Sequence, residues 1–195
     1  MIAGIVLSGG DSRRMGRSKA SLAVDGETFL ARAVRTLAEG GCSFVVVVLN
    51  PGEPSTAELL PTDVARLAWG GGAGTEQIDS LRAGLRALPE SAEAAIVLPV
   101  DHPWVRPETV LSLIETFRSD GAPVARPVCD GRHGHPTLFA AAVFHELLDE
   151  PLPEGARSVV RRHASVAASV EVSDRGVLID VDTPEDYERH IGVSQ

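Results

Sequence analysis

The chain has 195 residues, of which 44% are hydrophobic and 23% charged, so we expect one globular domain over residues 1–195 rather than a disordered or collagen-like chain. The formal net charge of −9 argues against a general affinity for nucleic acid or anionic membranes, so any anion site must be local. The sequence has two cysteines, starts without a signal-peptide pattern and contains no apolar stretch near the roughly 20 residues that span a bilayer. We therefore expect a cytoplasmic protein.

Apolar runs and helical spacings alternate along the chain. Strands are expected at residues 2–7, 44–49, 65–69, 94–100, 122–128, 168–172 and 177–181. Helices are expected at residues 27–37 (with Thr28 able to cap the start), 55–60, 76–88, 139–149 and 156–163, and from Pro107 and near Thr183. This order predicts an α/β fold with a mostly parallel sheet covered on both faces, in which ligands bind beyond the carboxyl ends of the strands.

A basic segment that contains glycines follows the first strand, at residues 7–22 (LSGGDSRRMGRSKASL). It holds three glycines and the basic residues Arg13, Arg14, Arg17 and Lys19, and Lys19 is the sole lysine of the chain. Glycines let backbone N–H groups approach an anion, and guanidinium and ammonium groups neutralise phosphate charge, so the segment favours a polyphosphate ligand. Its spacing matches neither the Walker A motif nor the dinucleotide-binding fingerprint.

Four further segments carry recognisable patterns: VLPVDHPWVRPETV, DSLRAGL, GRHGHPTLF and LIDVDTPEDY. Together with the basic segment, which is similar to L-x-x-G-x-S-x-R-M-G-x-x-K-x-x-L, they resemble the MobA-like nucleotidyltransferases. GRHGHPTLF is similar to the G-x-x-G-H-P-x-L-F segment of the molybdenum cofactor cytidylyltransferase branch. The resemblance implies a three-layer Rossmann-like fold. It also implies transfer of a nucleoside monophosphate, CMP from CTP in that branch, to a phosphorylated acceptor such as molybdopterin, with release of pyrophosphate.

The resemblance also implies roles for individual residues. Arg14 and Lys19 would hold the β and γ phosphates and stabilise the leaving pyrophosphate, since this transfer depends on positioning and charge stabilisation. Asp101 would act in catalysis as a ligand of Mg²⁺, with Asp182 preferred over Asp180 as the second ligand. His135 is expected to bind the acceptor. The remaining contacts to the nucleotide would come from Leu7, Ser8, Gly9, Gly10 and Ser80.

Several alternatives stay open at this stage. LSGG departs from the cytidylyl branch toward its guanylyl-using relatives, so GTP is a second candidate, and Asp11 is expected to weaken phosphate binding. The acceptor could be a sugar phosphate or another phosphorylated metabolite, and the protein could be a non-catalytic carrier or work with a molybdoenzyme or a cofactor-biosynthesis protein. A soft-metal site at Cys129, His133 and His135 lacks any usual zinc spacing. Trp104 and Phe139 could flank a pterin, although single aromatic residues more often pack in a core.

Overall fold

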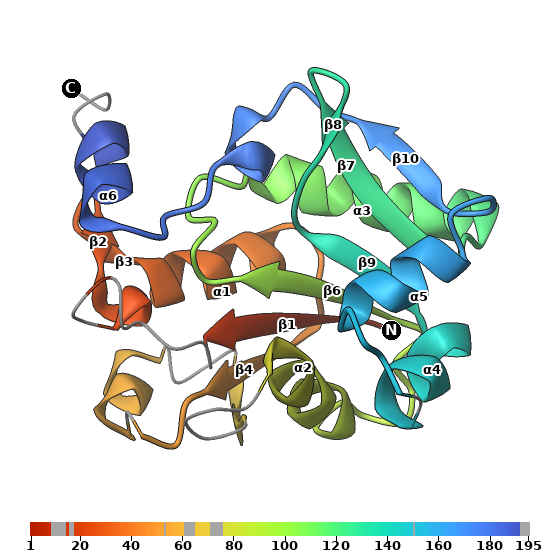
Figure 1. Cartoon of the computed structure of the whole chain (residues 1–195), viewed down its shortest axis with the longest axis horizontal. Coiled ribbons are helices and arrows are strands. Elements are labelled where there is room, and N and C mark those ends of the chain that lie inside the picture. The colour runs from red at the N-terminus through yellow and green to blue at the C-terminus, as the bar shows by residue number, and fades with distance from the viewer. Residues whose placement is uncertain are drawn as a thin grey trace.

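The computed structural model describes residues 1–8, 15, 18–52, 54–60, 65–70, 76–149 and 151–191. Helices cover both faces of a central sheet (Figure 1), so the predicted three-layer α/β architecture is confirmed. Most of the predicted phosphate loop lies outside the described residues, including Gly9, Gly10, Asp11, Arg13, Arg14, Gly16 and Arg17. Among the described helices, none has the length and apolar composition needed to cross a lipid bilayer.

The central sheet is mostly parallel and has the strand order β10-β7-β9-β6-β1-β4-β5, with β8 paired to β7. Its strands β1, β4, β5 and β6 are parallel to one another, whereas β9 runs antiparallel to its neighbours β6 and β7. Strands in the middle of such a sheet are buried on both faces, which explains their almost continuous apolar sequences. The bounds are β1 Ile2–Ser8, β4 Phe44–Leu49, β5 Ala65–Trp69, β6 Ala94–Pro99, β7 Val124–Cys129, β8 Arg132–His133, β9 Thr137–Ala140 and β10 Ala168–Glu171.

Two hydrophobic cores lie on opposite faces of the sheet. On one face, α1 (Phe29–Glu39) and α3 (Pro107–Asp120) pack their apolar sides against it. The other face is covered by α2 (Gln77–Arg86), α4 (Phe144–Asp149) and α5 (Ala156–Arg162). The shorter elements are β2 Ala23–Val24, β3 Glu27–Thr28, α6 Pro184–Ile191 and the 3₁₀ turns η1 Lys19–Ser21, η2 Pro54–Leu59, η3 Ala141–Val143 and η4 Arg175–Leu178.

The predicted cap of the first helix is present, because the Thr28 hydroxyl accepts a hydrogen bond from the backbone N–H of Ala31. Three predicted elements differ from the structure. The helix expected at residues 139–149 begins only at Phe144, since the preceding apolar residues form β9 and η3. The strand expected at 177–181 is partly replaced by η4, whose first turn is stabilised by the Asp174 carboxylate accepting from the N–H of Gly176. The helix expected at 55–60 is the 3₁₀ turn η2.

Candidate active site

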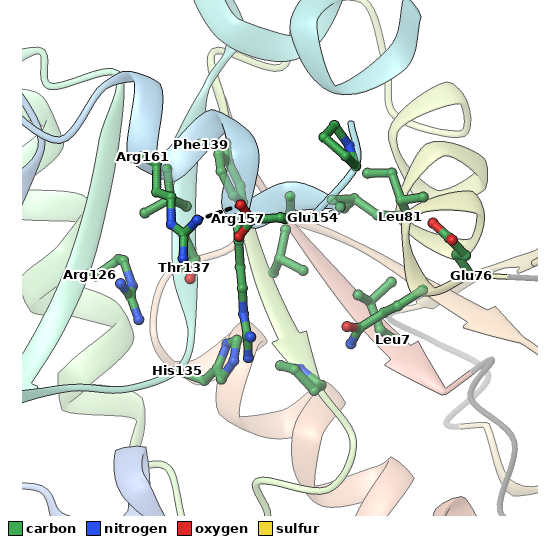
Figure 2. A pocket seen from close by; sticks show the side chains of 18 residues that line it. Leu7, Glu76, Leu81, Arg126, His135, Thr137, Phe139, Glu154, Arg157 and Arg161 are labelled. Carbon is green, nitrogen blue, oxygen red and sulfur yellow. Dashed lines mark hydrogen bonds and ion pairs between the residues drawn. The ribbon is translucent and has the colours of Figure 1, made fainter. Parts of the chain in front are cut away.

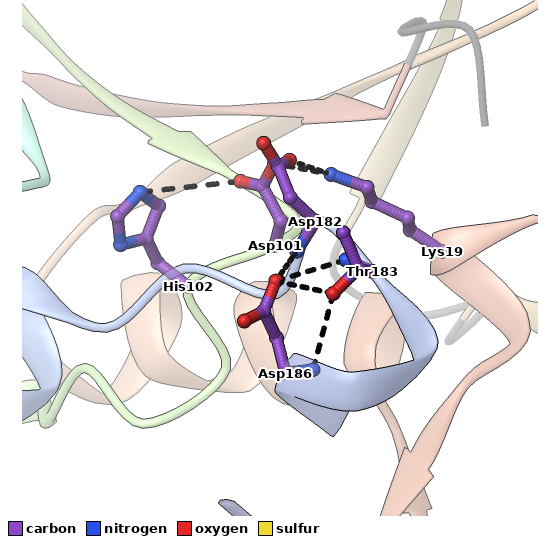
Figure 3. Close-up of polar contacts among 6 residues, drawn as sticks. All are labelled: Lys19, Asp101, His102, Asp182, Thr183 and Asp186. Carbon is purple, nitrogen blue, oxygen red and sulfur yellow. Dashed lines mark hydrogen bonds and ion pairs between the residues drawn. The ribbon is translucent and has the colours of Figure 1, made fainter. Parts of the chain in front are cut away.

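Three residues from distant parts of the sequence meet at one ammonium group. Lys19 Nζ donates to Asp101 Oδ2 at 2.9 Å and to Asp182 Oδ1 at 2.6 Å (Figure 3). The three side chains are 16%, 23% and 35% exposed, respectively, so the cluster is partly shielded from water but open to a ligand. The structure therefore brings together the lysine and both carboxylates to which the sequence assigned phosphate and metal binding.

Backbone contacts at the carboxyl end of β6 set the positions of the two carboxylates. The N–H of Val100 donates to the carbonyl of Leu7, which holds the start of the following turn against β1. The N–H of Val181 then donates to the carbonyl of Asp101 at 3.0 Å, so the residue that follows Val181 lies beside the end of β6. Asp101 and Asp182 are thus adjacent because of a direct backbone contact.

The start of α6 leaves the Asp182 carboxylate available for Lys19. Thr183 and Asp186 cap this helix reciprocally: Thr183 Oγ1 donates to Asp186 Oδ2 at 2.8 Å, and the N–H of Asp186 donates to Thr183 Oγ1 at 3.2 Å (Figure 3). The capping role that Asp182 could have filled therefore belongs to its neighbour. Asp180 is exposed, and Lys19 bonds with Asp182, so the geometry favours Asp182 as the partner of Asp101.

Lys19 begins the turn η1, in which the next residues are anchored in the core. Ala20 and Leu22 are buried, and the carbonyl of Leu22 accepts from the N–H of Phe29 at 2.7 Å. The hydroxyl of Tyr187 on α6 donates to the carbonyl of Ala23 at 2.6 Å. These contacts join the chain around the lysine to the helix that follows Asp182.

The charges in this cluster suit a cation held between two carboxylates. Burial alone would lower the pKa of Lys19, but the charges of Asp101 and Asp182 and their hydrogen bonds outweigh it, so the pKa is raised and the group is an ammonium ion at neutral pH. Carboxylate oxygens are also the ligands that Mg²⁺ prefers. No group of three or more metal-ligating side chains occurs in the part of the chain that the structure describes. Two carboxylates fit an ion that completes its coordination with substrate phosphates and water.

A cavity of about 620 Å³ lies between the sheet and the helices α2 and α5 (Figure 2), and its connection to the cluster runs through His135, which lines it and packs against His102, the residue after Asp101. Leu7, Val97 and Phe139 of the sheet, with Ile78 and Leu81 of α2, give it an apolar lining. Polar and charged side chains also line it, namely Glu76, Gln77, Arg126, His135, Thr137, Glu154, Arg157 and Arg161. A cavity with apolar walls and a few charged groups is typical of a site for a small organic ligand.

The arginines of this cavity differ in how their charge is balanced. Arg161 is paired with Glu154 (Figure 2). Arg126 and Arg157, by contrast, make no hydrogen bond or ion pair with any described residue. Burial, and then the positive charge of Arg157, lower the pKa of Arg126, which is the effect expected of two cations near each other without a carboxylate between them. Arg157 is exposed, so water can solvate its charge, whereas Arg126 is partly buried, and a partly buried guanidinium group without a carboxylate partner is suited to an anionic ligand.

His135 lies at the end of the cavity nearest Asp101, and the glycine before it explains its position. A Cβ on Gly134 would lie 2.2 Å from the carbonyl oxygen of Val177, so only glycine allows the two chains to approach this closely. The N–H of His135 then donates to the same carbonyl at 2.9 Å. Burial lowers the pKa of the His135 ring to about 3, with a further contribution from the neighbouring His102. His135 is therefore neutral at neutral pH.

His102 directly follows Asp101 and is the second histidine of this region. Its Nε2 lies 4.0 Å from Asp101 Oδ1, the carboxylate oxygen that does not contact Lys19 (Figure 3). The rings of His102 and His135 are 4.7 Å apart between centroids. Burial lowers the pKa of His102, and the charge of Asp101 only partly opposes this.

The other residues singled out in the sequence lie at the borders of the site or in the core. Leu7 lines the cavity, and Ser8 is the buried last residue of β1. Ser80 is 4% exposed and lies on α2 beneath Gly70, where a Cβ would be 2.6 Å from the Ser80 hydroxyl oxygen. Trp104 packs edge-on against Phe29 rather than in the cavity, with ring centroids 6.2 Å apart. Cys129 is buried and His133 is exposed on β8, and neither belongs to a group of three or more metal-ligating side chains among the described residues.

Sequence reasoning missed Arg126, Arg157 and His102 as site residues. The two arginines come from β7 and α5, which are far apart in the sequence. The chain has 17 arginines in all, and nothing in the sequence around these two sets them apart. Among the described residues, Arg126 and Arg157 are distinguished by lining the cavity without the carboxylate partner that the third cavity arginine, Arg161, has. His102 carried a local signal, because it directly follows the strand-end aspartate in VLPVDHPW.

Comparison with known proteins agrees with this fold. The sequence of residues 4–166 matches the protein family described as the MobA-like NTP transferase domain. A probable molybdenum cofactor guanylyltransferase of Mycobacterium avium (strain 104) is 33% identical over 188 residues, which are 95% of this chain and 92% of that protein. The crystal structure of Rv0371c from Mycobacterium tuberculosis H37Rv is 25% identical with a TM-score of 0.84, covering 98% of this chain and 97% of that one. A manganese complex of Rv0371c is 23% identical with a TM-score of 0.81, covering 98% of each chain.

The fold and the family match are those of a nucleotidyltransferase. The chain belongs to the MobA-like NTP transferase family, as its motifs predicted.

Proposed function

We propose that this protein transfers a nucleoside monophosphate from a nucleoside triphosphate to the phosphate group of a molybdopterin-type acceptor. An oxygen of the acceptor phosphate forms a bond to the α-phosphorus, the bond from that phosphorus to the bridging oxygen of the β-phosphate breaks, and pyrophosphate leaves. The observation that carries this proposal is the meeting of Lys19, Asp101 and Asp182, which the histidines His102 and His135 connect to a cavity that holds Arg126 and Arg157.

On the nucleotide side, Lys19 and the loop residue Arg14 would bind the β and γ phosphates and stabilise the charge of the leaving pyrophosphate. Asp101 and Asp182 would hold Mg²⁺, which would neutralise charge on the phosphates when bound. The Lys19 ammonium, which contacts both carboxylates, would then exchange these partners for phosphate oxygens. Gly9 and Gly10 would contribute backbone N–H groups, and Leu7, Ser8 and Ser80 would border the nucleotide.

On the acceptor side, Arg126 and Arg157 would bind the acceptor's anionic groups, and His135 would contact the phosphate nearest Asp101. The apolar lining formed by Leu81, Val97 and Phe139 suits a flat organic ring system. A charged, phosphorylated ligand with a ring is the chemistry of molybdopterin. This composition favours molybdopterin over a sugar phosphate, which carries no comparable apolar surface.

For the base, CTP is our first candidate. The sequence SLRAGL of α2, which contains the buried Ser80, and the segment GRHGHPTLF are similar to the cytidylyltransferase branch. GTP is the second candidate, because the relative from Mycobacterium avium is named a probable guanylyltransferase and the chain has LSGG at the end of β1.

The proposal is tested by measuring pyrophosphate release with CTP, GTP and ATP, each with and without molybdopterin, in Mg²⁺ and in Mn²⁺. We expect release that requires both metal and acceptor and that is fastest with CTP. Arg126→Met should raise the acceptor KM at least about tenfold while leaving the nucleotide KM within about twofold. Arg118→Met, which removes an exposed arginine on α3, is the matched control. Nucleotide binding without release under all conditions would favour a non-catalytic carrier, and release with a sugar phosphate alone would reassign the acceptor.

A further inference from the structure

The two histidines beside the cavity share an unusual property. The Nδ1 atoms of His102 and His135 are both buried, and neither has a hydrogen-bond partner among the described residues. Most buried polar side-chain atoms in folded proteins are hydrogen-bonded, because leaving one unpaired costs about 1–3 kcal/mol. Two unpaired nitrogens in adjacent rings are therefore an exception that needs an explanation, and because both Nδ1 atoms are closed to solvent, a ligand would contact these rings through Nε2.

The sheet topology brings the two rings together. His102 follows β6 and His135 precedes β9, and these strands are antiparallel neighbours in which Val97 is paired with Thr137. The rings that project beyond this pairing are 4.7 Å apart between centroids and inclined at 51°. Each ring thus limits how the other can turn.

The pair connects the two halves of the proposed site. His102 Nε2 lies 4.0 Å from Asp101 Oδ1, while the other oxygen of that carboxylate bonds to Lys19. His135 lines the cavity together with Arg126 and Arg157, and Figure 2 shows the Arg157 side chain extending to the His135 ring. An acceptor phosphate bound by the arginines would share the cavity with His135.

The chemistry of the transfer requires a particular kind of hydrogen-bond donor at this place. The attacking phosphate is most nucleophilic as a dianion. An imidazolium ion could give it a proton, whereas a neutral imidazole donates a hydrogen bond and keeps its proton. His135 is neutral at neutral pH, and a neutral imidazole has one N–H group and one acceptor nitrogen.

We infer that the His135 ring donates a hydrogen bond to the attacking phosphate of the acceptor, and that His102, packed against it, is a positioning residue that fixes the His135 ring relative to Asp101. This inference rests on the proposed function, since it presumes a phosphorylated acceptor. Arg126 and Arg157 supply the attraction for the anion, and the histidine pair directs one of its oxygens toward the α-phosphorus.

The contact can be observed directly by nuclear magnetic resonance of the histidine ring nitrogens, with inorganic phosphate as the probe. The chain has six histidines, so each signal can be assigned from single substitutions. We expect the ring signals of His135, and by contact those of His102, to shift as phosphate is added, with exposed His145 on α4 as the unshifted control. The shift should disappear in Arg126→Met, which weakens phosphate binding. Unchanged His135 signals at a phosphate concentration that saturates the Arg126-dependent site would overturn the inference.

Kinetics separate a contact from a purely structural role. His135→Leu should raise the acceptor KM at least about tenfold, and His135→Gln, which keeps a neutral donor, should recover most of that loss. His102→Phe keeps a packed ring and should lower kcat about tenfold with little change in nucleotide affinity. His145→Gln is the control for both. Equal losses in His135→Leu and His135→Gln would also overturn the inference. Failure of the proposed function would instead appear as no transfer in the wild type, whatever the phosphate titration showed.

Discussion

Replacing Lys19 by methionine tests the ammonium group that lies between Asp101 and Asp182. Methionine keeps an unbranched side chain of similar bulk but removes the charge and the hydrogen bonds of 2.9 and 2.6 Å. One hydrogen bond between charged groups contributes about 1.5–3 kcal/mol in a shielded site. Because these carboxylates are partly exposed, we take that same amount for the two hydrogen bonds of Lys19 together. A metal ion that binds these carboxylates without nucleotide must first displace the ammonium group. Removing this competition should tighten metal binding roughly 10- to 100-fold.

The assay is Mn²⁺ binding without nucleotide, followed by electron paramagnetic resonance, together with nucleotidyl transfer by the same variant. Lys19→Met should bind Mn²⁺ more tightly than the wild type, yet transfer at least about a hundredfold more slowly, a loss of about 2.7 kcal/mol of transition-state stabilisation. Lys19→Arg should restore little activity, because a forked guanidinium group cannot place its charge as a compact ammonium group does. Unchanged Mn²⁺ affinity combined with full transfer in Lys19→Met would refute the reasoning.

Three further changes test the packing and the buried charges. Gly84→Val should lower the free energy of unfolding in urea by about 1–3 kcal/mol, because a Cβ there would lie 2.7 Å from Ile5 and 3.0 Å from Val48; an unchanged midpoint would contradict this packing. Burial lowers the pKa of His135 to about 3 in the folded protein. Below about pH 6.5 the unfolded chain therefore binds more protons than the folded protein, and the free energy of unfolding should fall by about 2 kcal/mol from pH 6.5 to pH 5. His135→Gln should flatten this slope, and equal slopes would argue against a neutral buried ring. Burial alone would raise the pKa of Glu146, but hydrogen bonds from His163 and Arg162 outweigh it and lower the pKa. The stabilisation from this carboxylate is therefore present above about pH 4.5 and is lost as the pH falls through the pKa of Glu146 in the folded protein. Glu146→Gln should therefore lose less stability than the wild type on acidification below about pH 4.5, and parallel curves would show that the carboxylate contributes nothing.

The alternation of strands and helices was predictable from the sequence because parallel strands buried on both faces have continuous apolar sequences. Phe44–Leu49 and Ala94–Pro99 are such segments, and both are strands in the structure. Thr137–Ala140 is equally apolar but short, and the same pattern fits the start of a buried helix. Its assignment to β9 depends on antiparallel pairing with β6 and β7, which no local pattern encodes.

The site could be predicted in part for the same reason. Asp101 lies at the end of an apolar strand, and Lys19 lies in a basic segment, so each carries a local signal. Their contact joins positions 82 residues apart, and the contact of Lys19 with Asp182 joins positions 163 apart. The resemblance already favoured Asp182 over Asp180, and the coordinates add the contact of Asp182 with Lys19 and the cap of α6 by Thr183 and Asp186, which no local pattern encodes.

The central claim is that this protein moves a nucleoside monophosphate, and the position of a phosphorus label tests it most directly. Two reactions are run with CTP or GTP, molybdopterin and Mg²⁺, one with the label on the α-phosphate and one with the label on the γ-phosphate. We expect the α label to appear on the acceptor and the γ label in pyrophosphate, in equal amounts and only when metal and acceptor are both present. Transfer of the γ label to the acceptor, or stoichiometric binding of nucleotide with neither label transferred, would contradict the claim.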